Sequence, residues 1–145
     1  MTEPLDPQAA RSTLRLRVRF CDTDLMGIVH HANYLEYFEA GRVEWLRRRG
    51  VNYADWAARG LHLPVVDASL KYRAPARFDD EIDVETTLGE LRAASLRFDY
   101  RVTRSGSLLC EGSTRLACVN SEHTLRRFTD EMLTVLTARE APGSG

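Results

Sequence analysis

A short acidic segment separates two regions of different periodicity in this chain of 145 residues. From Leu14 to Arg19, apolar and basic residues alternate as in a half-buried strand, and from Asn33 onward apolar residues recur every three or four positions as in a helix. A carboxylate therefore lies just before a helix N-terminus, where free N–H groups and a partial positive charge can stabilise an oxyanion. A base beside an oxyanion site is the minimum set of groups for acyl transfer. Asp24 is the candidate base, although its spacing fits equally well an aspartate that only caps the turn or the helix.

The elements that would hold this segment are one long helix and a set of strands. Predicted strands cover residues 14–21, 63–73, 80–92, 95–104 and 108–120, and predicted helices cover 32–49, 53–59 and 129–138. The clearest alternation places Leu96, Phe98 and Tyr100 on one face of their strand. Short turns between consecutive strands predict antiparallel pairing, so the fold class is α+β with the long helix against one antiparallel sheet. Gly41 in the middle of that helix costs about 1 kcal/mol relative to Ala, which predicts close packing against the sheet.

The length of the chain predicts one domain at residues 13–138. A flexible N-terminal arm (1–12) precedes it and a disordered tail (139–145) follows it. The sheet would use one face for the helix and leave edge strands that invite pairing. We therefore expect a homodimer in which the sheet continues from one copy into the other.

Composition disfavours several classes of function. A formal net charge of -1 and a pI of about 6.4 argue against a general nucleic-acid or anionic-membrane surface. Nearly all the basic side chains are Arg, whose planar guanidinium group suits phosphate. A local phosphate-binding site is therefore compatible with the near-neutral net charge of the chain. The three cysteines have neither disulfide nor zinc spacing. No run has the length of a membrane span or the pattern of a signal peptide, which favours a cytoplasmic location.

Three separate blocks carry characteristic residues at fixed spacing. They read DTDLMGIVHHANY at 22–34 with YFEAGR at 37–42, YRAPARFDD at 72–80, and ACVN at 117–120. Together they resemble the signature of the 4-hydroxybenzoyl-CoA thioesterase family, most closely its YbgC-type acyl-CoA thioesterases, over about residues 14–135. The resemblance implies the hotdog fold, in which a curved antiparallel sheet wraps a long central helix. It also implies dimers or tetramers with active sites at the subunit boundary.

The resemblance assigns roles to two residues of the first block. It implies that Asp24 is the catalytic carboxylate, which either attacks the thioester carbonyl or activates water. It places His31 at the start of the helix, where its backbone N–H polarises the carbonyl or its imidazole takes part directly. Phe20 stands where some relatives carry Tyr, so a phenol at that position is not a general requirement.

Coenzyme A has a phosphorylated head, which needs cations at the mouth of a cleft, and a narrow arm, which needs a slot with few charges. The Ala-Pro-Ala turn is bracketed by three cations, Lys71, Arg73 and Arg77. They are candidates for binding the phosphorylated head of coenzyme A, or else they are ordinary exposed charges at strand ends. By analogy with the family, the segment from Val66 to Ser69 of a neighbouring subunit lines the slot. The resemblance also implies a role for Ser95 in orienting water or the carboxylate, because relatives often carry Ser or Thr at the start of that strand.

These observations predict a homo-oligomeric hydrolase, either a dimer or a tetramer of two dimers, that converts acyl-CoA and water to a carboxylic acid and CoA. The acyl group is fatty or aromatic, and an acyl carrier protein thioester is another possible substrate because it carries the same arm. No cofactor is expected, since coenzyme A enters as part of the substrate. No metal is expected either, because His30 and His31 lack a third ligand at suitable spacing. The alternatives are a hotdog hydratase or dehydratase acting on acyl thioesters, and a non-catalytic acyl-thioester-binding protein.

Overall fold

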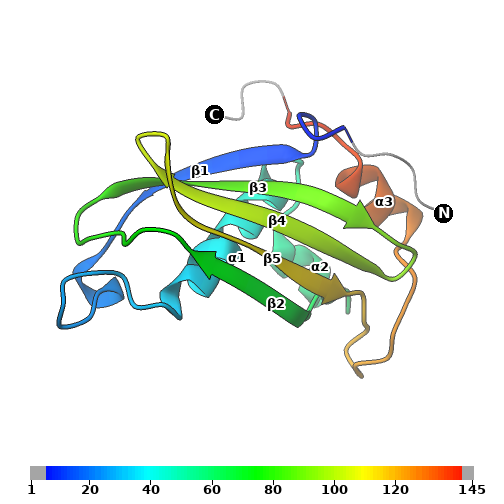
Figure 1. The fold of residues 1–145 in the computed structure, drawn as a ribbon. Helices are drawn as coiled ribbons and strands as arrows, with labels where there is room; N and C mark the ends of the chain where they lie inside the picture. The colour runs from blue at the N-terminus through cyan, green and yellow to red at the C-terminus, as the bar shows by residue number, and fades with distance from the viewer. Residues whose placement is uncertain (1–5, 142–145) are drawn as a thin grey trace.

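A curved antiparallel sheet lies across one long helix in the computed structural model, which describes residues 6–141 (Figure 1). The strands are β1 (Arg11–Arg17), β2 (Val65–Tyr72), β3 (Glu81–Leu91), β4 (Ser95–Arg104) and β5 (Ser107–Ala117). The helices are α1 (Asn33–Arg47), α2 (Tyr53–Ala58) and α3 (Asp130–Leu136), and a 3₁₀ turn covers Phe20–Asp22. The predicted α+β class is confirmed, and the long elements lie within a few residues of their predicted positions.

The strand order β1-β3-β4-β5-β2 leaves β1 and β2 at the two edges of the sheet. The β1 edge is charged, because Arg11, Arg15 and Arg17 pair with acidic side chains of β3. The β2 edge is exposed along most of its length and presents the apolar Val65 and Val66, which are 43% and 59% exposed. The two edges therefore differ in chemistry, and β2 is the one suited to pairing with another strand.

The core forms where α1 packs on the inner face of the sheet. Phe38 of α1 stacks on Tyr100 with ring centroids 4.2 Å apart, and Trp45 meets Phe98 edge-on at 5.1 Å. Gly41 lies between these two aromatic residues on α1. A Cβ added to it would lie 2.5 Å from the Thr86 hydroxyl oxygen and 2.9 Å from a methyl carbon of Val84. The predicted close packing at this glycine is confirmed.

We expect Gly41→Ala to destabilise the protein, although Ala is the better helix former by about 1 kcal/mol. The added methyl group would have to displace Thr86 and Val84, and overpacking of this kind costs about 1 to 3 kcal/mol. The clash outweighs the gain in propensity, so the net loss in the free energy of unfolding should be about 1 kcal/mol. Urea unfolding of the two proteins measures it, and a more stable variant would contradict the packing argument.

Two predicted details are wrong. Leu35 fits the three- and four-residue spacing of apolar residues that predicts the buried face of the long helix, but it is 41% exposed, and Tyr37 is buried instead. The first strand ends at Arg17 rather than at residue 21. Phe20, whose position continues the apolar alternation of that strand and so predicts burial, is 77% exposed. The chain leaves the sheet early because the Asp22 carboxylate accepts a main-chain N–H three residues before it, which favours the 3₁₀ turn.

The part of the predicted N-terminal arm that the structure describes is folded onto the domain. The Ala10 carbonyl accepts the indole N–H of Trp45 at 2.8 Å, and β1 already begins at Arg11. β1 thus begins two residues before the predicted start of the domain at residue 13, and α1 bonds to the chain at residue 10. The first five and the last four residues of the chain, which include most of the predicted tail, lie outside the described residues.

Candidate active site

The segment between β1 and α1 folds into a tight loop, the Asp24 loop (residues 23–29). Thr23 and Val29 form an antiparallel bridge across it, and the Asp24 N–H donates to the Ile28 carbonyl at 2.9 Å. Gly27 closes the turn, because its N–H donates to the Asp24 carbonyl at 3.0 Å. Its φ of 77° lies in the left-handed region that favours glycine. The loop is thus a miniature hairpin that fixes the backbone of Asp24.

The side chain of Asp24 is exposed, and its Oδ1 accepts the Met26 N–H at 2.8 Å. This bond is the capping role that the sequence allowed as an alternative. Within the described residues, the other oxygen, Oδ2, accepts no hydrogen bond. One oxygen therefore orients the carboxylate while the second remains available to a substrate carbonyl or to a water molecule.

Asp22, two residues earlier, is a carboxylate buried at the base of the loop and only 1% exposed. It accepts the main-chain N–H of Arg19 at 3.0 Å, the Arg19 guanidinium at 2.9 Å and the Tyr37 hydroxyl at 2.9 Å. Burial alone would raise the pKa of Asp22, but the hydrogen bonds from Arg19 and Tyr37 outweigh it and hold the pKa below its ordinary value. The carboxylate is therefore ionised throughout the neutral range.

This ionised carboxylate should make part of the protein's stability sensitive to acid. Because the pKa of Asp22 is lower in the folded state than its ordinary value of 3.8, its contribution is lost as the pH falls through the folded pKa. We expect the stability difference between the wild type and Asp22→Asn to be constant above about pH 5 and to shrink below about pH 4. Urea unfolding of both proteins across this pH range measures the difference. A gap that does not change with pH would contradict the assignment.

The start of α1 lies beside the loop and has no side-chain cap. His30 and His31 precede it with exposed rings whose centroids are 4.2 Å apart. Among the described residues, no backbone acceptor takes the His31 N–H, whereas the His31 carbonyl accepts the Tyr72 hydroxyl at 3.0 Å. The Asn33 side chain donates to the Asp22 carbonyl at 2.7 Å and ties the helix start to the loop. A free N–H at the start of a helix is the group that an oxyanion site requires.

The predicted cationic residues lie at the same end of the sheet as the Asp24 loop. Arg77 forms a bridge with Ile28, so its exposed side chain lies beside the Asp24 loop. Arg73 follows β2 and is also exposed, but its guanidinium pairs with Glu111 at 2.8 Å. Lys71 is exposed on β2. Of these cations, Arg77 is held most directly beside the loop.

Of the other predicted binding residues, two lie at the far end of the sheet and one lies midway along β2. Val66 precedes Tyr72 by six positions on β2, which is roughly 20 Å of extended strand. Ser69 lies midway along β2, and Ser95 begins β4 level with the start of β2. Within one chain, Val66 and Ser95 therefore do not approach Asp24.

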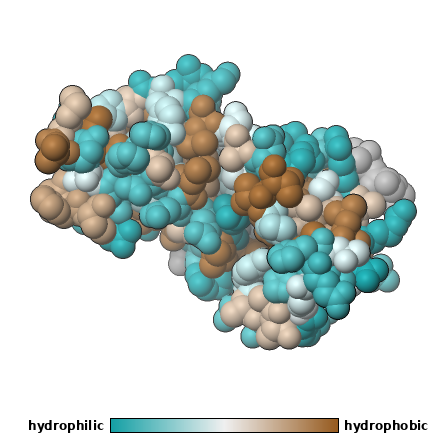
Figure 2. Space-filling model, turned by 90° about the horizontal axis from the view of Figure 1, so that it is seen from below, coloured by the Kyte–Doolittle hydropathy of each residue, from teal (hydrophilic) through white to brown (hydrophobic). Residues whose placement is uncertain are grey.

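Exposed apolar side chains surround the candidate carboxylate. Phe20, Leu25 and Met26 are 77%, 108% and 79% exposed, and Phe78 is 52% exposed. Phe20 and Phe78 meet edge-on with ring centroids 5.6 Å apart. Figure 2 shows hydrophobic surface at the end of the molecule that carries this loop. A cluster of this kind beside Asp24 marks a surface for a ligand or a partner.

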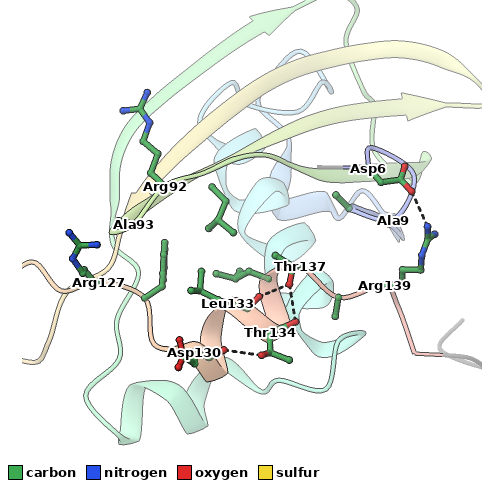
Figure 3. A pocket seen from close by; sticks show the side chains of 15 residues that line it. Asp6, Ala9, Arg92, Ala93, Arg127, Asp130, Leu133, Thr134, Thr137 and Arg139 are labelled. Atoms are coloured by element: carbon green, nitrogen blue, oxygen red, sulfur yellow. Dashed lines mark hydrogen bonds and ion pairs between the residues drawn. The ribbon is translucent and has the colours of Figure 1, made fainter. Parts of the chain in front are cut away.

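A cavity of about 920 Å³ lies away from these residues, between α3, the β3–β4 turn and the chain before β1 (Figure 3). None of the predicted site residues lines it. The hydroxyls of Thr134 and Thr137 donate to carbonyls of their own helix, and Arg139 pairs with Asp6. Because these polar groups are already bonded to one another and to the backbone, the cavity is not a candidate for the predicted chemistry.

Three residues of the site were not singled out from the sequence, namely Asp22, Tyr37 and Tyr72. A signal was available for Tyr37, which lies three positions after Tyr34 and four before Gly41 and so shares the packed face of the helix. Asp22 and Tyr72 gave no comparable signal, because an acidic turn residue and a strand-end tyrosine are ordinary features of loops and strands.

Comparisons with known proteins identify the family of this chain. The family model described as the thioesterase-like superfamily matches residues 18–137. The acyl-CoA thioester hydrolase YbgC of Escherichia coli O6:H1 is 33% identical over 106 residues, which cover 72% of this chain and 79% of that protein.

Solved structures show the same fold. A hypothetical protein from Thermus thermophilus is 44% identical with a TM-score of 0.83, and the match covers 86% of this chain and 96% of that one. The DHNA-CoA thioesterase from Staphylococcus aureus is 27% identical with a TM-score of 0.78, over 81% of this chain and 80% of that one. Within residues 6–141, no helix is long and apolar enough to cross a membrane.

Proposed function

The chain belongs to the thioesterase-like superfamily, and from this premise we propose that it hydrolyses acyl-CoA thioesters to a carboxylic acid and free CoA. One observation supports this assignment above the others. Within the described residues, Asp24 presents a carboxylate oxygen with no hydrogen-bond partner, and Asp22, which immediately precedes its loop, is hydrogen-bonded to the N-terminus of α1. A base and an oxyanion donor are thus built into one rigid unit, as thioester hydrolysis requires.

In the proposed reaction the thioester oxygen lies against the His31 N–H, which stabilises the negative charge that develops there. Asp24 either takes a proton from the attacking water or attacks the carbonyl itself to form an anhydride that water then cleaves. In both routes the carbon–sulfur bond breaks and the CoA thiolate leaves and takes up a proton. The acyl group leaves as a carboxylic acid.

We propose that a second copy of the chain completes the site. An antiparallel pairing of two β2 strands about a twofold axis would bring the Val66 end of one copy to the Tyr72 end of the other. Val66 of the second copy would then approach the Asp24 end of the sheet, which it does not do within one chain. Ser69 of both copies would lie near the axis, and Ser95 would lie two strands away from the pairing edge. A homodimer that continues the sheet therefore accounts for the predicted role of Val66, which a single copy leaves far from Asp24.

The head of CoA would meet Arg77 first, with Lys71 and Arg73 nearby. The exposed apolar residues around Asp24 support a hydrophobic acyl group, fatty or aromatic, carried by CoA or by an acyl carrier protein. The tetramer built from two dimers, the cytoplasmic location and a reaction without metal or cofactor stay predictions.

A thiol-release assay on purified protein tests the function. The panel should contain short, medium and long fatty acyl-CoAs together with benzoyl-CoA. We expect release of free CoA from at least one of them, with a matching amount of carboxylic acid. Crotonyl-CoA is included because its hydration without thiol release would indicate a hydratase. Tight binding of acyl-CoA with no release would contradict the enzymatic assignment.

A further inference from the structure

Asp22 bonds to each of the segments that position the reacting groups. Its carboxylate accepts the main-chain N–H and guanidinium of Arg19, just after β1, and the hydroxyl of Tyr37, from α1. Its carbonyl accepts the His30 N–H at 2.9 Å and the Asn33 side-chain amide at 2.7 Å. The chain enters and leaves the Asp24 loop between these bonds. The loop and the first two turns of the helix are therefore fixed to one residue.

The bond from Tyr37 is more than the local turn requires. The Arg19 N–H already caps the 3₁₀ turn, and the Arg19 guanidinium already supplies the opposite charge that a buried carboxylate needs. Burial and the Asp22 carboxylate both raise the pKa of Tyr37, so its hydroxyl remains a donor at neutral pH. The bond between Tyr37 and Asp22 is therefore a permanent link between the body of α1 and the base of the loop.

The bond between Tyr37 and Asp22 connects the two segments that carry the proposed reacting groups. Asp24 follows Asp22 along the chain, and His31 lies just before the start of the helix that carries Tyr37. Asp24 is two residues from the Asp22 carboxylate, and His31 is one residue from the N–H that the Asp22 carbonyl accepts. An exposed carboxylate on a loop is useful only if it is held at a set distance from the oxyanion donor. A displacement of about 1 Å in such a pair can cost about a hundredfold in rate.

We propose that Asp22 and Tyr37 are positioning residues for the thioesterase reaction. They do not contact the substrate, and they set the distance between the Asp24 carboxylate and the His31 N–H. The inference rests on the proposed function, since it names residues that support the same site.

The test compares Tyr37→Phe with Tyr100→Phe. Each change removes one buried phenol oxygen and its hydrogen bond, because the Tyr100 hydroxyl bonds to the Thr114 hydroxyl at 2.6 Å inside the sheet. We expect a similar fall in melting temperature for both variants. We expect kcat to fall about tenfold in Tyr37→Phe with KM within about twofold, and to stay near the wild-type value in Tyr100→Phe. Equal kcat values in the two variants, measured well below their melting temperatures, would overturn the proposal.

Amide hydrogen exchange gives a second readout that does not depend on activity. The Asp24 and Gly27 N–H groups should exchange faster in Tyr37→Phe than in Tyr100→Phe, and faster still in Asp22→Asn if that variant folds. Unchanged exchange at both amides in Tyr37→Phe would overturn the positioning role. If the wild type releases no thiol from any acyl-CoA, the proposed function fails, and the exchange data alone still decide whether Tyr37 fixes the loop.

Discussion

Asp24→Asn should lose nearly all thioester hydrolysis while it keeps the fold. Asn retains the oxygen that accepts the Met26 N–H, so the turn of the Asp24 loop is preserved. The change removes only the negative charge and the basicity of the side chain, which are the properties that a nucleophile or a general base needs. We expect kcat to fall by about 10²- to 10⁴-fold, with a melting temperature close to that of the wild type. Thiol release under saturating acyl-CoA measures the loss.

Asp79→Asn is the matched control for this variant. Asp79 is also an exposed aspartate in a loop near the same end of the sheet, and its φ of 69° is one that Asn tolerates well. The control should retain wild-type turnover. If Asp24→Asn does so as well, Asp24 is a turn residue only and the proposed chemistry is wrong.

The two routes open to Asp24 differ in where the oxygen of the product comes from. With enzyme in excess over substrate in ¹⁸O-labelled water, a general base delivers labelled oxygen to the acid in the first turnover. A nucleophile whose anhydride is cleaved at the Asp24 carbonyl delivers unlabelled oxygen to the acid and leaves the label in the protein. Mass spectrometry of both products therefore separates the routes.

His31 should respond differently, because its proposed contribution is a backbone group. His31→Ala keeps the N–H at the helix start and the carbonyl that accepts the Tyr72 hydroxyl. The ring itself is exposed and lies against His30. A rate within about tenfold of wild type and an unchanged pH profile would support the backbone role, whereas a larger loss with an altered profile would assign the imidazole.

Much of the fold could be predicted because hydrophobic periodicity reports which face of each element is buried. Alternation in β4 and the three- and four-residue spacing in α1 depend only on local sequence, and both predictions are confirmed. The early end of β1 could not be predicted, because it depends on the side chain of Asp22 competing for a main-chain N–H. The burial of Tyr37 could have been predicted from its spacing to Tyr34 and Gly41, but the bond from its hydroxyl to Asp22 could not, because the two residues belong to different elements.

The candidate site shows the same division between local and long-range information. The sequence motif identified Asp24 and the start of the helix because they lie close together along the chain. It did not identify Tyr72, whose hydroxyl reaches the His31 carbonyl from another strand. Periodicity also gave no sign that Val66 and Ser95 lie at the opposite end of the sheet from Asp24, because strand order is not encoded in alternation.

Because Val66 lies far from Asp24 within one chain, we expect activity to depend on the pairing of two chains at the β2 edge. The Ser69 carbonyl faces Gly112 of β5. Because the N–H and C=O groups of successive residues in a strand point to opposite sides, the Ala68 N–H points away from β5, toward the open edge. Ala68→Pro therefore keeps the bonds between β2 and β5. It removes an outward donor that a second β2 would use, and its ring obstructs the approach of that strand.

We expect Ala68→Pro to be a folded monomer whose kcat/KM is lower by about a hundredfold, because the proposed second copy would no longer supply its share of the site. Thr13→Pro is the matched control on the opposite edge. The Val18 N–H donates to the Asp80 carbonyl at 2.8 Å, so by alternation the Thr13 N–H also points outward. This control should keep both the dimer and the activity, as measured by analytical ultracentrifugation and thiol release. An active monomeric wild type, or a dimeric Ala68→Pro, would show that β2 is not the interface and that one copy holds the complete site.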